Sequence, residues 1–129
     1  VRYRSDAEAA AFLRCGAWLN FTLRDAIRAA AARRGDRPFL HEGDRTLSYA
    51  GYDADAERLA AALLARGLRP GDRVLFQMGT CIETAVALGA CFKAGLIPVC
   101  TLAQHREIEI GQLGALTQPR GYLVQADFS

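Results

Sequence analysis

The chain has 129 residues, of which 51% are hydrophobic and 23% charged, so it can form one compact domain and has the composition of a folded protein. Its 16 lysines and arginines are interspersed with 14 aspartates and glutamates, which leaves a net charge of +2 and argues against a nucleic-acid-binding surface. No apolar run is long enough to span a bilayer, so we expect no membrane span.

Two helices are predicted in the N-terminal third. Ser5 and Glu8 form a capping-box pattern before a short helix that ends near Gly16. After an irregular link, Thr22 begins a second helix with the same cap pattern in weaker form. Its apolar residues share one face as far as about Arg34. Both helices are therefore predicted from local signals alone.

A hairpin and a long helix come next. Residues 39–47 predict a small β-hairpin with its turn at positions 43–44. Ser48 then has the position of an N-cap for a helix with a leucine stripe. Gly67 supplies the left-handed residue at which such a helix ends.

From residue 73 onward, strand and helix patterns alternate. One helix pattern starts at a capping box formed by Thr80 and Glu83 and stops at Gly95, and a second covers residues 106–118. This alternation predicts an α/β fold, namely a small parallel sheet with flanking helices (βαβαβ), preceded by helices and a hairpin. The apolar runs of strand length are residues 73–78, 96–102 and 121–126.

The four cysteines indicate a reducing, cytoplasmic location. None of them forms a Cys-x-x-Cys pair, and neither His41 nor His105 stands at a zinc-ligand spacing from them. Most lie in apolar stretches, where a free cysteine behaves as a small hydrophobic residue. We therefore expect no metal site and a cytoplasmic protein. The cysteines are Cys15, Cys81, Cys91 and Cys100.

Two loops at the carboxyl ends of predicted strands are candidate sites. The loop before Thr80 leads into a helix N-terminus and could cradle an anion, unless Thr80 simply caps that helix. His105 and Arg106 follow the second parallel strand, at the edge where open α/β sheets bind ligands, although an ordinary loop histidine is the plainer alternative. No phosphate loop, Ser/His/Asp set or metal cluster can be assembled, so no catalytic residue is assigned.

Three stretches in order resemble the N-terminal portion of the acyl- and aryl-acid adenylating enzymes, the superfamily of acyl-CoA synthetases and AMP-dependent ligases. "LSYAGY" is similar to the first core motif of that family, with Gly51 in place of its glutamate and Tyr52 in place of its second leucine. "FKAGLIPV" is similar to the second core motif, and "PVCTLAQHR" to the branch that contains 2,3-dihydroxybenzoate–AMP ligases and cyclic or aromatic acid CoA ligases. The resemblance covers roughly residues 20–127.

The resemblance implies a larger enzyme. Such a ligase activates a carboxylic acid with Mg-ATP to an acyl adenylate and passes the acyl group to coenzyme A or to a carrier-protein thiol. Its phosphate loop, acyl pocket and catalytic lysine would lie beyond Ser129. We therefore expect residues 1–129 to be a single α/β subdomain, the N-terminal part of a longer AMP-binding domain, inactive and ligand-free alone and prone to self-association. The alternative is a stand-alone, non-catalytic binding module derived from such a ligase.

Lys93 lies directly before the end of a predicted helix and has two interpretations. The resemblance implies a contact with the 3′-phosphate of coenzyme A, made by a flexible point charge. A lysine in the last helical turn also stabilises the helix dipole and binds free carbonyls with no ligand at all. His105 and Arg106 are candidate residues of a loop on the substrate side of the site.

Overall fold

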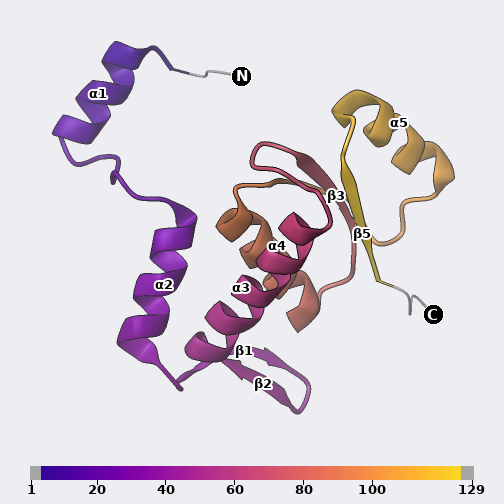
Figure 1. The fold of residues 1–129 in the computed structure, drawn as a ribbon, viewed down its shortest axis with the longest axis horizontal. Coiled ribbons are helices and arrows are strands. Elements are labelled where there is room, and N and C mark those ends of the chain that lie inside the picture. Colours follow the sequence, from indigo (N-terminus) through magenta and orange to yellow (C-terminus); the bar gives the residue numbers. More distant parts are fainter. Residues whose placement is uncertain (1–3, 126–129) are drawn as a thin grey trace.

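A computed structural model describes residues 4–125 as a chain of helices around two small sheets (Figure 1). The helices are α1 (Asp6–Arg14), α2 (Leu23–Arg34), α3 (Tyr49–Ala65), α4 (Ile82–Ala94) and α5 (Glu107–Thr117). The strands are β1 (Pro38–Glu42), β2 (Arg45–Ser48), β3 (Arg73–Gln77), β4 (Ile97–Cys100) and β5 (Gly121–Val124).

The sheet topology confirms the predicted fold class. Strands β1 and β2 form an antiparallel hairpin, and β3, β4 and β5 form a parallel sheet with β3 in the centre. Helices α3 and α4 lie on one side of this sheet and α5 on the other (Figure 1). The strands are shorter than predicted, and Ala126, the last residue of the predicted third strand, lies outside the described residues.

The local caps form as their residue types predict. Ser5 Oγ accepts a hydrogen bond from the Glu8 amide at 3.3 Å, and the Glu8 carboxylate accepts one from the Ser5 amide at 2.9 Å. Thr22 makes a complete capping box in the same way. Ser48 Oγ accepts from the backbone amide three residues later, at the start of α3. The first three helices therefore begin where side chains satisfy their free amides.

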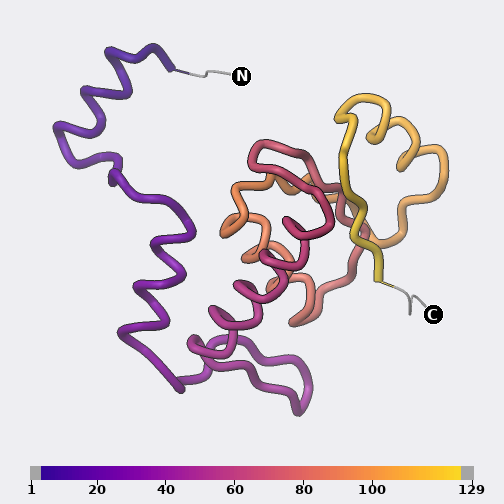
Figure 2. Tube along the Cα trace, viewed as in Figure 1, coloured from indigo at the N-terminus to yellow at the C-terminus, as the bar shows by residue number. Residues whose placement is uncertain are grey.

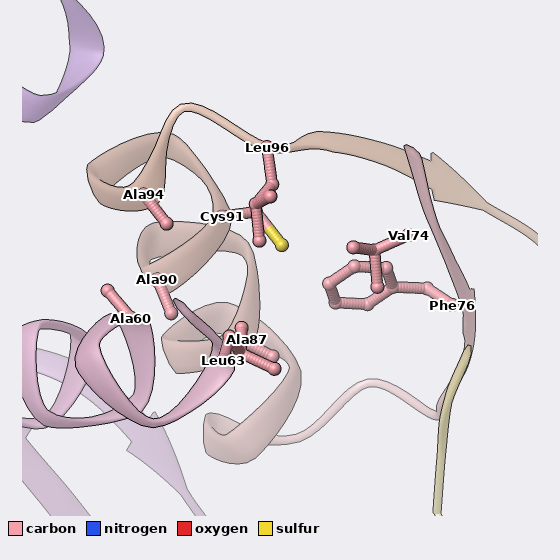
Figure 3. Packing of buried hydrophobic residues seen from close by; sticks show 9 residues of the cluster. All are labelled: Ala60, Leu63, Val74, Phe76, Ala87, Ala90, Cys91, Ala94 and Leu96. Carbon is pink, nitrogen blue, oxygen red and sulfur yellow. The ribbon is translucent and has the colours of Figure 1, made fainter. Parts of the chain in front are cut away.

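The core lies between the parallel sheet and the two helices α3 and α4. Val74 and Phe76 alternate with Leu75 along β3, so they point to the same face of the sheet. Figure 3 shows both side chains directed toward Cys91 and Leu96. Because β3 is central and the three residues from Val74 to Phe76 are all buried, it has the continuous apolar pattern of a strand covered on both faces.

Helices α3 and α4 approach closely at Gly89. The Tyr52 hydroxyl reaches across from α3 and donates a hydrogen bond to the Ala85 carbonyl at 3.1 Å. A β-carbon built on Gly89 would lie only 2.4 Å from that hydroxyl oxygen, so the glycine makes room for the tyrosine. Tyr52, which stands in place of the second leucine of the first core motif, therefore packs at a specific position between α3 and α4.

The N-terminal segment stands apart from this core. Helix α1 lies away from the body of the fold in Figures 1 and 2, and none of its residues is buried. Several large apolar side chains around it and in the following link are exposed. Within residues 4–125, no helix combines the length and hydropathy that crossing a membrane requires. The exposed side chains include Leu13, Trp18, Leu19 and Phe21.

Candidate functional site

The loops that follow β3 and β4 diverge at the carboxyl edge of the sheet. The first leads to α4 on one side of the sheet, and the second leads to α5 on the other side (Figure 1). In open α/β sheets, ligands bind in the crevice left where two adjacent strands send their connections to opposite faces. The space between the ends of β3 and β4 is therefore the candidate site.

A cavity of about 490 Å³ occupies this position, and we call it the crevice. Its walls are residues 78–81 after β3, residues 84, 85 and 88 of α4, and residues 101–104 after β4. This volume is within the range of about 300–1,000 Å³ that is typical of small-molecule sites. A second cavity of about 570 Å³ lies at the amino ends of β3 and β5, away from the diverging loops.

The wall after β3 is held by short hydrogen bonds. Thr84 Oγ1 donates to the Gly79 carbonyl at 2.6 Å, and the Gly79 amide donates to Gln125 Oε1 at 3.0 Å. The half-buried Cys81 has its sulfur 3.3 Å from Thr84 Oγ1. Because both the amide and the carbonyl of Gly79 are bound, this loop has a defined conformation at the mouth of the crevice.

The predicted capping box at Thr80 and Glu83 is wrong. The N-cap of α4 is Cys81, which makes no side-chain cap. Instead the Glu42 carboxylate, from the hairpin, accepts a hydrogen bond from the Ile82 amide at 3.0 Å. A carboxylate from a distant part of the chain therefore binds one of the free amides at the start of α4, in place of a side-chain cap from Thr80.

An arginine supports this arrangement from the hairpin. Arg45 lies 3.3 Å from Glu42 and also forms an ion pair with Glu83 in the first turn of α4. The hydrogen bond from Arg45 holds the pKa of Glu83 below its ordinary value. The N-terminus of α4 thus has charged partners from within the protein, and the hypothesis that the loop before it cradles an anion stays a prediction.

The wall after β4 carries the two predicted loop residues at its end. His105 Nδ1 accepts a hydrogen bond from the Leu102 amide at 3.4 Å, and the Arg106 amide donates to Glu109 Oε2 at 2.9 Å. Neither His105 nor Arg106 lines the crevice, because the lining ends at Gln104. Both lie directly after it, and Arg106 is exposed. Their role on the substrate side stays a prediction.

Lys93 lies far from these residues. It is in the last turn of α4, roughly 16 Å along the helix axis from the first turn that borders the crevice. Its side chain is fully buried, and Nζ is 2.7 Å from Glu57 Oε2 and 2.7 Å from Asp53 Oδ1, both on α3. The Asp53 oxygen is not aligned for a hydrogen bond, so charge attraction dominates that contact.

The ion pairs of Lys93 explain why a lysine occupies the last turn of α4. Arg24 and Arg28 of α2 approach the same Glu57 carboxylate at 3.9 Å, so three helices meet at one charge cluster. The contact of Lys93 with coenzyme A stays a prediction. It would require the ammonium group to leave two carboxylates in order to reach a phosphate.

Sequence reasoning missed three polar residues that shape the crevice. Gln77 and Gln125 stand at or just after the carboxyl ends of β3 and β5, and their side chains bind loop backbone. Glu42 binds α4 from the hairpin. A signal existed for Gln77, because a carboxamide that ends an apolar strand at the ligand-binding edge needs partners there.

The buried Cys91 is not a reactive thiol. It lies in the core, and burial, with a smaller contribution from Cys100, raises the pKa of its thiol to about 11. A thiol with that pKa is protonated at neutral pH, whereas the thiolate is the nucleophile. Cys91 therefore has a packing role. No group of three His, Cys, Asp or Glu side chains among the described residues is arranged to hold a metal ion.

Comparison with known proteins places these features in a family context. Residues 27–128 match the family described as AMP-binding enzyme. The salicyl-AMP ligase / salicyl-S-ArCP synthetase of Mycobacterium tuberculosis is 42% identical over 126 residues, which is 90% of this chain and 21% of that protein. The 2,3-dihydroxybenzoate-AMP ligase of Bacillus subtilis is 32% identical over 124 residues, 96% of this chain and 23% of that protein.

The fold also has a counterpart among solved structures. The apo structure of Mycobacterium smegmatis MbtA superimposes with a TM-score of 0.87 and 33% identity, covering 92% of this chain and 23% of that one. The chain spans about a fifth of the length of the curated relatives that it matches.

Proposed function

Because this chain belongs to the AMP-binding enzyme family, we propose that it is the N-terminal portion of an ATP-dependent carboxylic acid ligase. The observation that carries the proposal is the 42% identity to the salicyl-AMP ligase over 90% of the chain, together with the fold match to MbtA. In this proposal the whole protein forms an acyl adenylate from an acid and Mg-ATP. It then transfers the acyl group to a thiol, either that of coenzyme A or that of a carrier protein.

An aryl acid is the substrate class that we propose. Two relatives are named for salicylate and for 2,3-dihydroxybenzoate, and the "PVCTLAQHR" stretch resembles the same branch. The crevice has the right position for a ligand site, at the carboxyl ends of β3 and β4. His105 and Arg106 are proposed to face the substrate from the adjoining loop. The cytoplasmic location stays part of this proposal and rests on the dispersed cysteines.

We propose that the ATP site is formed by parts of the whole enzyme other than residues 1–129. The Ile82 amide at the start of α4 is bound by the Glu42 carboxylate, which places a negative charge where a phosphate would otherwise lie. When bound to the whole enzyme, Mg-ATP would supply the adenylyl group. We propose that residues 1–129 contribute a folded subdomain with the crevice rather than the reacting groups.

The isolated chain is therefore expected to show no acid-dependent exchange of pyrophosphate into ATP, because no phosphate-binding loop or catalytic lysine was found in its sequence. The assay would use the 129 residues, the full-length parent as a positive control, and a panel of aryl acids. Exchange by the chain alone, clearly above a protein-free blank, contradicts this expectation. A parent that fails to respond to any aryl or aliphatic acid contradicts the proposed function itself.

A stand-alone, non-catalytic module remains the second proposal. The specific observation in its favour is that the chain encloses a core of its own, with Leu75, Val74 and Cys91 fully buried. A reading frame that continues beyond Ser129 would support the ligase, and a stop codon at that point would support the module.

Self-association of the chain is a further expected result. Two edge strands of the parallel sheet are unpaired on their outer sides among the described residues, and Ile97, Tyr122 and Val124 on them are about half exposed. Free edges and apolar patches favour association, and a stable pairing typically buries about 1,000 Å² or more. Sedimentation equilibrium at micromolar concentration should give a mass above 14.0 kDa. A clean monomer that binds no hydrophobic dye would refute this.

A further inference from the structure

The apolar face of helix α2 borders a cavity of about 260 Å³ that separates it from the body of the fold. Four residues of α2 at positions i, i+3, i+4 and i+7 line this cavity, so they share one face of the helix. An apolar helix face normally packs against other side chains, yet no residue of α2 is buried. The interface of α2 therefore contains an unfilled apolar volume. The four lining residues are Leu23, Ala26, Ile27 and Ala30.

The opposite wall of the cavity consists of aromatic rings from β1, α3 and α4. The centre of the Phe39 ring lies 4.5 Å from that of Tyr49 and 4.9 Å from that of Tyr52, the second pair edge to face. The Tyr52 hydroxyl already donates to a backbone carbonyl of α4. This wall therefore offers ring faces and edges rather than free polar groups. Its rings are Phe39, Tyr49, Tyr52 and Phe92.

No residue that lines the cavity carries a charge. The arginines of α2 nearest in sequence, Arg24 and Arg28, are not in the lining and instead approach the Glu57 carboxylate at 3.9 Å. An ionised group inside the cavity would lose its hydration and gain no countercharge from the walls. The lining therefore selects an uncharged occupant.

Contacts outside the cavity hold α2 beside α3 (Figure 1). At its C-terminal end, the Gly35 carbonyl accepts a hydrogen bond from the Ala50 amide of α3 at 2.9 Å. Along its length, the two ion pairs with Glu57 tie α2 to the same helix. Because these contacts need no ligand, the cavity is pre-formed, as small-molecule sites usually are. Leu23 both lines the cavity and is exposed, so the cavity reaches solvent at the N-terminal end of α2.

We propose that this cavity, which we call the α2 cavity, is a binding site for a small uncharged aromatic molecule. An apolar cavity of about 150 Å³ stays dry and binds benzene, so the α2 cavity has room for a single ring with small substituents. Edge-to-face and offset contacts with Phe39 and Tyr52 favour an aromatic ring over a saturated one. The α2 cavity shares no lining residue with the crevice, and this inference goes beyond the proposed function without depending on it.

The first experiment is a titration of benzene into the 129-residue chain, followed by the methyl signals of Ile27 and Ala30 in NMR spectra. We expect saturable shifts at both residues, with an apparent Kd of about 1 mM for so small a ligand. Cyclohexane and benzoate are titrated in the same way. Cyclohexane should bind more weakly because it lacks the ring contacts, and benzoate roughly tenfold or more weakly because its carboxylate loses hydration.

The second experiment fills the α2 cavity. Ala26→Leu adds a branched side chain at the lining and should raise the Kd for benzene roughly tenfold or abolish the shifts. Ala30→Leu fills the same space from the next turn and should give the same result, so the test does not depend on one variant folding. Ala32→Leu is the matched control, because Ala32 is an exposed alanine of α2 outside the lining, and its Kd should equal that of the wild type.

Each part of the proposal can be overturned. Absence of saturable shifts at Ile27 and Ala30, or an unchanged Kd in the folded Ala26→Leu and Ala30→Leu variants, refutes the site. Benzoate that binds as tightly as benzene refutes the uncharged class, and cyclohexane that binds as tightly refutes the aromatic class. Adenylation activity enters none of these measurements, so a parent that activates no acid refutes the proposed function and leaves the α2 cavity to be decided by benzene.

Discussion

Replacement of Lys93 by methionine is expected to destabilise the chain by roughly 2–3 kcal/mol. Lys93 is the only lysine among the 16 lysines and arginines, and its buried ammonium lies 2.7 Å from both Asp53 and Glu57. Methionine fills the space of the stem but removes the ammonium that lies between Asp53 and Glu57, and Arg24 and Arg28 remain near Glu57 only. Breaking a fully buried ion pair costs about 3–5 kcal/mol, and the partial exposure of both carboxylates reduces that cost here.

Urea denaturation followed by circular dichroism would measure this loss. Arg58→Met on α3, the helix that carries Asp53 and Glu57, is the control, since its ion pair with Asp55 is exposed and exposed pairs contribute about 0–1 kcal/mol. Lys93→Arg should also be destabilising, because a planar guanidinium does not fit the site of a buried ammonium. A loss below about 1 kcal/mol for Lys93→Met would show that the charge cluster does not hold α4 against α3.

The same cluster predicts a dependence on pH. The hydrogen bond from Lys93, followed by the charges of Lys93, Arg28 and Arg24, lowers the pKa of Glu57 from its ordinary value of 4.5. A lowered pKa in the folded state contributes stability that is complete above about pH 4.5 and is lost as the pH falls through the folded value. The difference in stability between wild type and Lys93→Met should therefore narrow below pH 4.5.

Gly89→Val is expected to cost about 3 kcal/mol, at the upper end of typical overpacking. The first carbon of any side chain at this position would lie 2.4 Å from Tyr52 Oη, 2.8 Å from its Cζ and 3.2 Å from Ala56 Cβ. Tyr52 would have to leave the interface, and its hydrogen bond to the Ala85 carbonyl would be lost. The expected readout is a lower urea midpoint with an unchanged slope.

Gly111→Val provides the matched comparison. Gly111 is also in a helix, but a β-carbon there would meet nothing within 4 Å, so only helix propensity changes and it changes slightly in favour of valine. The double variant Gly89→Val/Tyr52→Ala should recover part of the loss, because it removes the ring that the valine strikes. Equal stability of Gly89→Val and Gly111→Val would rule out close packing at Gly89.

Much of the fold could be predicted from short-range patterns. The capping boxes at Ser5 and Thr22, the N-cap at Ser48 and the positive φ of Gly67 all act through neighbours within a few residues. The alternation of apolar strands and helices likewise predicted the parallel sheet, because burial on both faces produces continuous apolar strands. The order of the core motifs indicated the ligase family, which the comparisons confirm.

The candidate site depended on contacts that no local pattern contains. The carboxylate that binds the start of α4 comes from Glu42, 40 positions earlier, and Lys93 meets carboxylates on α3 that lie 36 and 40 positions away. Gln77 binds carbonyls 26 and 28 positions later. Helix caps and strand periods are set by the backbone within one or two turns, so the sequence by itself determined which elements form and where the first three helices begin. The pairing of polar groups was decided only by the tertiary structure, because packing brings distant elements within hydrogen-bond distance. A buried donor or charge is then stabilised by the acceptor or countercharge that lies beside it.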